Sequence, residues 1–166
     1  AIARFRGLPH RLELVRTLRL ARYKNKLSIY FYNDSAATNP HSTSVAVQSF
    51  NNPARRELAE SVILIAGDKD KNLDFKPLRQ ALKRSNVVSV ILYGENRNKI
   101  AGQIKVKGRN IEIINTLKDA IHRAFDLARQ IQNPRDITIL LSPGFASFDQ
   151  FRDYKHRGEE FKKIVL

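Results

Sequence analysis

The 166-residue chain contains no cysteine. This absence excludes disulfide bonds and thiolate metal ligands, and it gives mild support for a protein of the cytoplasm. No apolar run approaches the roughly 20 residues that a membrane-spanning helix needs, and no signal peptide is recognisable at the start. We therefore expect a soluble cytoplasmic protein. A single folded domain is the default for a chain of this length and composition.

Acidic residues are scarce: 16 Asp and Glu stand against 30 Lys and Arg, which gives a formal net charge of +14. Such an excess raises affinity for phosphate polymers, anionic membranes and acidic small molecules alike. The basic residues are scattered along the chain, as is typical of a solvated surface. A basic nucleic-acid-binding α/β module without catalytic activity is the alternative hypothesis, because three tyrosines are interleaved with basic residues between positions 22 and 32.

Several catalytic motifs are also missing. Neither GxGxxG nor GxxxxGK[ST] occurs, which excludes a dinucleotide fingerprint and a complete phosphate-binding loop. Ser142 and Ser147 lack the GxSxG context of a hydrolase nucleophile, so we reject acyl-enzyme chemistry. The four histidines have no spacing that indicates a zinc site, and we predict no metal site in this chain. We predict these four to be surface or capping residues: His10, His41, His122 and His156.

The hydrophobic pattern predicts alternating strands and helices. Five apolar runs without strict alternation are typical of parallel strands buried on both faces; they are 28–32, 61–67, 87–94, 110–114 and 136–142. Helical patterns lie between them at 44–50, 77–84 and 117–131. A further strand at 12–18 would pair antiparallel with its neighbour through a turn at 23–26, and 147–166 would form a closing helix, with a break at Gly158 as one option.

These elements predict an α/β fold. We expect a Rossmann-like, doubly wound and mostly parallel sheet of about six strands, flanked by helices and with one antiparallel edge strand. In open sheets of this kind, ligands bind beyond the carboxyl ends of the strands, where loops and helix N-termini present free N–H groups.

Three predicted strand ends are unusually polar: "YNDSAATNP", "AGDKDKNLDF" and "LSPGFASFDQF". Each has an ordinary explanation by itself. The first would supply turn and N-cap residues, Lys71 in the second would be solvated, and Ser147 in the third would cap the last helix. Together, the three loops would converge on one crevice that offers hydroxyls, N–H groups and one ammonium. That combination suits a carboxylate or phosphate ligand.

Four segments carry a resemblance to a known family. They are "FRGLPHRLELV" at 5–15, "YNDSAATNPHST" at 32–43, "GDKDKNLDF" at 67–75 and "LLSPGFASFDQFRDYKHRGEEF" at 140–161. In these segments the chain resembles the C-terminal domain of Mur ligases, and "NDSxATN" is similar to the members that add D-glutamate. The resemblance spans almost the full length.

The resemblance implies part of a three-domain, ATP-dependent ligase of peptidoglycan biosynthesis. Such enzymes join D-glutamate to UDP-N-acetylmuramoyl-L-alanine through an acyl phosphate. Residues 1–166 would be the third domain, without the UDP-binding first domain and the central ATPase domain that holds the phosphate loop and the Mg²⁺ ligands. ATP and Mg²⁺ are therefore the implied cofactors, and we expect the isolated domain to be inactive because it lacks that phosphate loop and metal site.

Site residues follow from the matching motifs. By resemblance, Arg11 would contact the transferred phosphate as a catalytic residue, and Asp34 would bind the nucleotide ribose. The residues implied to bind D-glutamate are Thr38, Lys71, Ser147 and Tyr154.

The sequence departs from the family pattern at three of these places. Tyr154 stands where many members have phenylalanine, and a contact through its backbone would survive that change. Ala36 stands where many have lysine, so one cation is absent near the phosphate or substrate. Gly144 and Phe145 replace the commoner alanine–cysteine pair; Phe145 is bulkier and Gly144 freer, which leaves the shape of that loop open.

Overall fold

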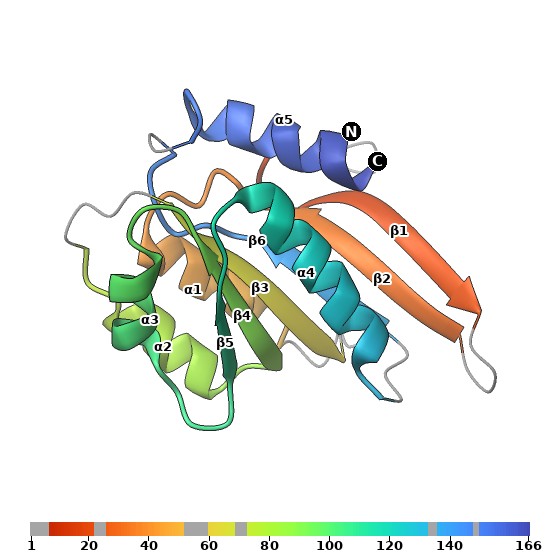
Figure 1. Ribbon diagram of the computed structural model, residues 1–166, viewed down its shortest axis with the longest axis horizontal. Coiled ribbons are helices and arrows are strands. Elements are labelled where there is room, and N and C mark those ends of the chain that lie inside the picture. The colour runs from red at the N-terminus through yellow and green to blue at the C-terminus, as the bar shows by residue number, and fades with distance from the viewer. Residues whose placement is uncertain (1–6, 22–25, 52–59, 69–72, 133–135, 148–149) are drawn as a thin grey trace.

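A computed structural model describes residues 7–21, 26–51, 60–68, 73–132, 136–147 and 150–166. Within these ranges, six strands form one sheet in the order β1-β2-β6-β3-β4-β5 (Figure 1). The strands are β1 (Glu13–Ala21), β2 (Lys26–Asn33), β3 (Ser61–Gly67), β4 (Val87–Tyr93), β5 (Asn110–Ile113) and β6 (Asp136–Leu141). β1 pairs antiparallel with β2, and all the other pairs are parallel. The predicted fold class is confirmed.

Helices cover both faces of the sheet (Figure 1). They are α1 (Pro40–Ser49), α2 (Lys76–Lys83), α3 (Arg97–Ile104), α4 (Leu117–Gln130) and α5 (Tyr154–Val165). α1, α2 and α3 pack on one face, and α4 and α5 pack on the other. Their helical connections let the strands run parallel, and burial on both faces explains why these strands are continuously apolar.

β3 illustrates how one strand serves two cores. Val62, Leu64 and Ala66 belong to the core under α1, α2 and α3, whereas Ile63 and Ile65 belong to the core under α4 and α5. Successive side chains of a strand point to opposite faces, so this run without polar residues fills both cores at once.

The helix boundaries differ from the sequence predictions in three places. α1 begins at Pro40, because the Asn39 side chain accepts a hydrogen bond from the Ser42 N–H and caps the helix there. α3 was not predicted, since its buried apolar residues are only Ile100 and Ile104. α5 begins at Tyr154 rather than 147, and Asp153 caps it.

Two further points concern α5 and the predicted turn. Ser147 is not the cap of α5, and the helix continues through Gly158 without a break. The turn predicted at 23–26 falls mostly outside the described residues. None of the helices in the described part of the chain is both long and apolar enough to cross a membrane.

Gly67 lets β3 and β4 stay close where β3 ends. Its φ is +118°, and a Cβ placed on it would overlap the Tyr93 carbonyl oxygen of the neighbouring strand. The obstacle is backbone, which cannot rotate aside. The last residue of β3 must therefore be glycine for this sheet edge to form.

We predict that Gly67→Ala lowers the free energy of unfolding by about 3 kcal/mol, from overlap and backbone strain together. Urea unfolding monitored by circular dichroism measures the change. Gly102→Ala is the control, because Gly102 lies in α3 and a Cβ placed on it meets nothing within 4 Å. Equal stability of the two variants would contradict the overlap.

Candidate functional site

The carboxyl ends of β2, β6 and β3 meet at one edge of the sheet. The Asp34 N–H donates to the Leu141 carbonyl at 2.7 Å, and the Gly67 N–H donates to the Pro143 carbonyl at 2.9 Å. Just beyond the strands, the Gly144 N–H donates to the Ala37 carbonyl at 2.9 Å. The loops after β2 and β6, which contain Thr38 and Ser147, are therefore adjacent, as the sequence predicted.

Arg157 of α5 ties these loops together. Its guanidinium is fully buried and donates to the Asp68 carboxylate after β3 at 2.9 Å. It also donates to the Phe145 carbonyl after β6 at 3.1 Å, and to the carbonyl and hydroxyl of Ser35 after β2 at 2.9 and 3.0 Å. One side chain thus contacts the loop after each of the three strands.

Sequence reasoning missed both Arg157 and Asp68. Arg157 is one of 30 basic residues and sits among charged neighbours, so its burial leaves no mark in the local pattern. Asp68 adopts a φ of 130°, which is rare for a residue other than glycine. The ion pair with Arg157 holds Asp68 in this strained backbone conformation.

We predict that Arg157→Met lowers the free energy of unfolding by about 3–5 kcal/mol, because it leaves the buried Asp68 carboxylate without its cation. Chemical unfolding measures the loss. The Asp68→Asn/Arg157→Met double variant should be more stable than Arg157→Met, since no lone charge is then buried. Arg123→Met, which breaks the more exposed pair with Glu112, is the control and should lose far less. A double variant no more stable than Arg157→Met would contradict this reasoning.

Asp34 lies beside this junction and is 7% exposed. One carboxylate oxygen accepts the Ser142 hydroxyl at 2.7 Å, and the other accepts the Leu12 N–H at 3.2 Å. Burial raises the pKa of Asp34 to about 6, although the Ser142 and Leu12 hydrogen bonds and the nearby Arg11 charge oppose the rise. The carboxylate is therefore ionised at neutral pH, and each oxygen keeps a lone pair for another donor.

The raised pKa of Asp34 predicts a pH dependence of stability. The folded state holds this proton more tightly than the unfolded state, whose carboxyl has its ordinary value of 3.8. The stability it provides is present below pH 4 and is lost as the pH rises through about 6. Relative to Asp34→Asn, the wild-type free energy of unfolding should fall by about 2 kcal/mol between pH 4 and pH 7. A difference that stays constant across these pH values in urea titrations would contradict the assignment.

A pocket of about 290 Å³ opens beside Asp34. Arg11, Ala36 and His41 also line it, so the position where many family members have lysine borders this space. Its volume is at the lower end for ligand pockets and suits one portion of a nucleotide, such as a ribose. A carboxylate and an exposed guanidinium can there accept from hydroxyls and donate to phosphate oxygens respectively.

His10 is 7% exposed, so its predicted surface position is wrong. The Asn33 amide lies 3.0 Å from its Nδ1, and Asn33 already accepts the Ser35 N–H through its oxygen, so the amide nitrogen donates to the ring. The ring's proton is then on Nε2, 3.5 Å from Glu159. Burial and the Lys162 charge lower the pKa of His10, against the opposing effects of Glu13 and Glu159. A Cβ on Gly158 would overlap this ring, so the glycine in α5 makes room for it.

The structure separates hydroxyls that hold the fold from hydroxyls that have no hydrogen-bond partner among the described residues. Ser35 donates to the Tyr154 carbonyl at 2.7 Å, Thr43 donates to the Ser142 carbonyl at 3.2 Å, and Ser142 donates to Asp34. The Thr38 and Ser147 side chains make no hydrogen bond to another described residue. Thr38 is exposed and Ser147 is 3% exposed.

The remaining predicted residues have different outcomes. The Tyr154 carbonyl accepts from Ser35, a backbone contact that does not depend on the side chain. Lys71 falls outside the described residues. Within the described ranges, no group of three or more His, Asp or Glu side chains could hold a metal ion.

Residues 10–144 match the family described as "Mur ligase, glutamate ligase domain". The chain belongs to this Mur ligase C-terminal domain family. Its relatives include proteins named UDP-N-acetylmuramoylalanine–D-glutamate ligase. That of Bdellovibrio bacteriovorus is 39% identical over 161 residues, which is 97% of this chain and 30% of that protein. That of Aquifex aeolicus is 37% identical over 164 residues, or 99% and 34%.

The Mur ligase domain thus spans about a third of the length of these relatives. Among solved structures, UDP-N-acetylmuramate-alanine ligase MurC from Thermotoga maritima aligns with 97% of this chain and 31% of that chain, at a TM-score of 0.55 and 15% identity. At that identity the likeness concerns the fold alone.

Proposed function

We propose that this chain is the C-terminal domain of a cytoplasmic, ATP-dependent ligase that joins D-glutamate to UDP-N-acetylmuramoyl-L-alanine. Relatives named UDP-N-acetylmuramoylalanine–D-glutamate ligase align with 97–99% of the chain. The observation that carries the proposal is the junction at the sheet edge, where Arg157 brings together the loops of Thr38 and Ser147 next to Asp34.

In the proposed reaction, ATP transfers its terminal phosphate to the carboxylate of the UDP-linked substrate, which gives an acyl phosphate and releases ADP. The D-glutamate amine attacks the activated carbonyl carbon, and phosphate leaves as the amide bond forms. The UDP-binding and central domains of such a ligase would hold that substrate, Mg²⁺ and most of the ATP. This chain would orient the incoming amino acid and one side of the nucleotide, which places the reacting groups within reach of each other.

D-glutamate carries two carboxylates and needs several hydrogen-bond donors. Thr38 and Ser147 offer hydroxyls that no other described residue engages, and Lys71 would add a positive charge. Charge-assisted hydrogen bonds of this kind are shorter and stronger than neutral ones. We assign these three residues to D-glutamate binding, together with the backbone of Tyr154.

The nucleotide would contact the other side of the loop that follows β2. Asp34 is ionised at neutral pH and can accept from a ribose hydroxyl, while Arg11 in the same pocket can stabilise charge on the transferred phosphate. In that role Arg11 is the catalytic residue of this chain.

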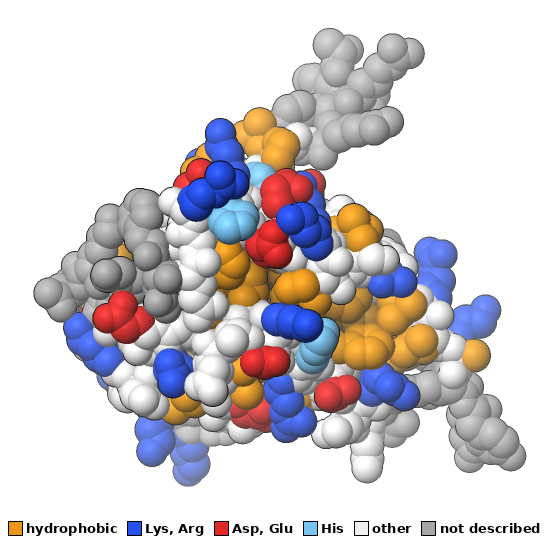
Figure 2. Space-filling model, turned by 45° about the horizontal axis from the view of Figure 1, so that its top comes forward, with side chains coloured by type: hydrophobic (Ala, Val, Ile, Leu, Met, Phe, Trp, Pro, Cys, Tyr) orange, Lys and Arg blue, Asp and Glu red, His pale blue; other side chains and the backbone are white. Residues whose placement is uncertain are grey.

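The nucleic-acid alternative receives no support from the visible surface. Figure 2 shows Lys and Arg side chains interspersed with Asp and Glu over that face, rather than a continuous basic strip. A strand of nucleic acid binds along a positively charged groove with exposed aromatic rings. The charge on this face is instead that of a solvated surface.

The test uses the parent protein with all three domains, assayed for ligation at varied D-glutamate and varied ATP. Ser147→Ala and Lys71→Ala should each raise the KM for D-glutamate by about 10- to 100-fold, because each removes a hydrogen bond to a charged group worth about 1.5–3 kcal/mol. The KM for ATP should change little. The 166-residue chain alone should give no ligation.

Ser49→Ala is the matched control, since among the described residues that hydroxyl donates within α1 to the Ala46 carbonyl. Its kinetic constants should equal those of the wild type. Equal effects of Ser147→Ala on D-glutamate and ATP would remove Ser147 from its assigned role, and ligation by the chain alone would remove the need for the other domains.

A further inference from the structure

Half of the chain's net charge lies in one stretch that the proposed function does not use. Residues 73–110 contain nine Lys or Arg and two Asp or Glu, a net charge of +7 out of the total of +14. This stretch includes α2, β4 and α3, and the two helices lie on the same face of the sheet. The net positive charge of this stretch comes from its scarcity of acidic residues, and both of its helices lie on one face of the sheet.

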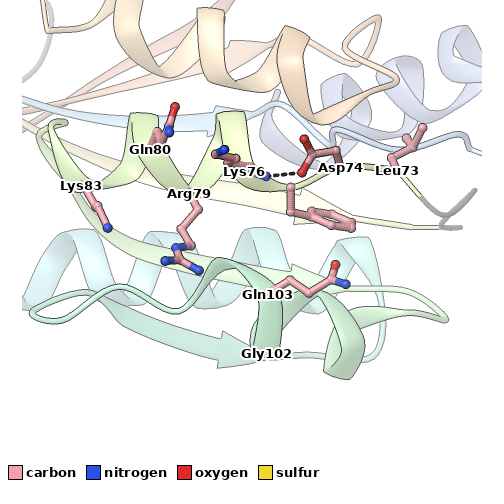
Figure 3. A pocket seen from close by; sticks show the side chains of 9 residues that line it. Leu73, Asp74, Lys76, Arg79, Gln80, Lys83, Gly102 and Gln103 are labelled. Atoms are coloured by element: carbon pink, nitrogen blue, oxygen red, sulfur yellow. Dashed lines mark hydrogen bonds between the residues drawn. The ribbon is translucent and has the colours of Figure 1, made fainter.

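A pocket of about 480 Å³ lies between α2 and α3 (Figure 3). Lys76, Arg79 and Lys83 line it from α2, and Gly102 and Gln103 line it from α3. In Figure 3, Arg79 reaches from α2 toward α3, where Gln103 and Gly102 form the opposite wall.

The cations of this pocket are not neutralised by the fold. The Lys76, Arg79 and Lys83 side chains make no hydrogen bond or ion pair with another described residue. Asp74 is the single acidic residue among the described lining residues, and one of its oxygens accepts the Lys76 backbone N–H at 2.9 Å. Positive charge thus exceeds negative charge around a space large enough for a small molecule.

The base of the pocket is formed by a side chain that is packed into the core. Phe75 lines it, is 4% exposed and stacks on Phe145 with ring centroids 5.3 Å apart. Both rings belong to the core under α1, α2 and α3. A ligand would therefore meet a wall that is already formed, which lowers the entropic cost of binding.

We propose that the α2–α3 pocket binds a small polyanion that carries two or more linked phosphate groups. Lys76 and Lys83 are seven residues apart, about 10 Å along the helix axis, so a single phosphate could contact all three cations only if both lysine side chains bent toward it. A linear chain of phosphates can pair with the three cations in extended side-chain conformations. Arg79, between them, has the planar fork of donors that suits phosphate oxygens, and Gln103 adds an amide donor from the facing helix.

This site differs from the one beside Asp34. The two pockets share no lining residue: Arg11 and Asp34 line one, and Arg79 and Gly102 line the other. Substitutions can therefore test the two separately, and either proposal can fail without the other.

The experiment is calorimetric titration of the 166-residue chain with inorganic tripolyphosphate at 150 mM salt. The decisive pair is Gly102→Glu and Gly102→Gln, which have the same size and differ by one negative charge. A Cβ at Gly102 meets nothing within 4 Å, so both side chains leave the helix into open space. We expect Gly102→Glu to bind tripolyphosphate at least about tenfold more weakly than Gly102→Gln, and orthophosphate to bind the wild type more weakly than tripolyphosphate.

Two charge-matched substitutions complete the test. Arg79→Ala should weaken tripolyphosphate binding severalfold. Lys118→Ala removes the same charge from α4, on the other face of the sheet, and should leave it unchanged. Equal affinities for the Glu and Gln variants, or equal losses in Arg79→Ala and Lys118→Ala, would overturn the proposal. Loss in Arg11→Ala with none in Arg79→Ala would also overturn it, because tripolyphosphate would then occupy the pocket beside Asp34.

Discussion

The buried ion pair between Arg157 and Asp68 is the constraint on which the candidate site depends. A guanidinium and a carboxylate without solvent contact are stable only when each is compensated, and here they face each other at 2.9 Å. The remaining donors of Arg157 contact Ser35 and Phe145, so the same group that neutralises one loop also fixes the two others. Since α5 supplies this group, the last helix positions the loops of Ser35 and Asp68, which are far from it in sequence.

The polar residues of this edge have two distinct uses. The Ser35 and Thr43 hydroxyls donate to backbone carbonyls and the Ser142 hydroxyl donates to Asp34, which keeps a partly polar interior stable. Thr38 and Ser147 are not engaged by the other described residues, and in the proposed function they bind the ligand. Asp34 accepts from Ser142 and also borders a pocket, so the proposal gives it both uses. A rigid first set allows the second set to be presented without reorganisation.

Much of the fold could be predicted because parallel strands buried on both faces have a strong signal. The runs at 61–67 and 136–142 correspond to β3 and β6, and the strand predicted at 12–18 is the antiparallel edge strand β1. Features with a weaker sequence signal were not predicted correctly. α3 was not predicted because only two of its eight residues are buried and apolar. Asp153 rather than Ser147 caps α5, and the sequence could not distinguish them because several polar residues before that helix are equally suitable as caps.

The sequence alone determined the α/β class, the polar strand ends and their meeting at one edge, since the hydrophobic period and the direction of the strands require it. Tertiary structure alone decided which polar side chains became buried. Arg157, Asp68 and His10 look like surface residues in the sequence, because burial of a charge or a ring depends on partners from distant segments. The local sequence pattern cannot show such partners. They meet only in the folded protein, where the last helix packs over the loops.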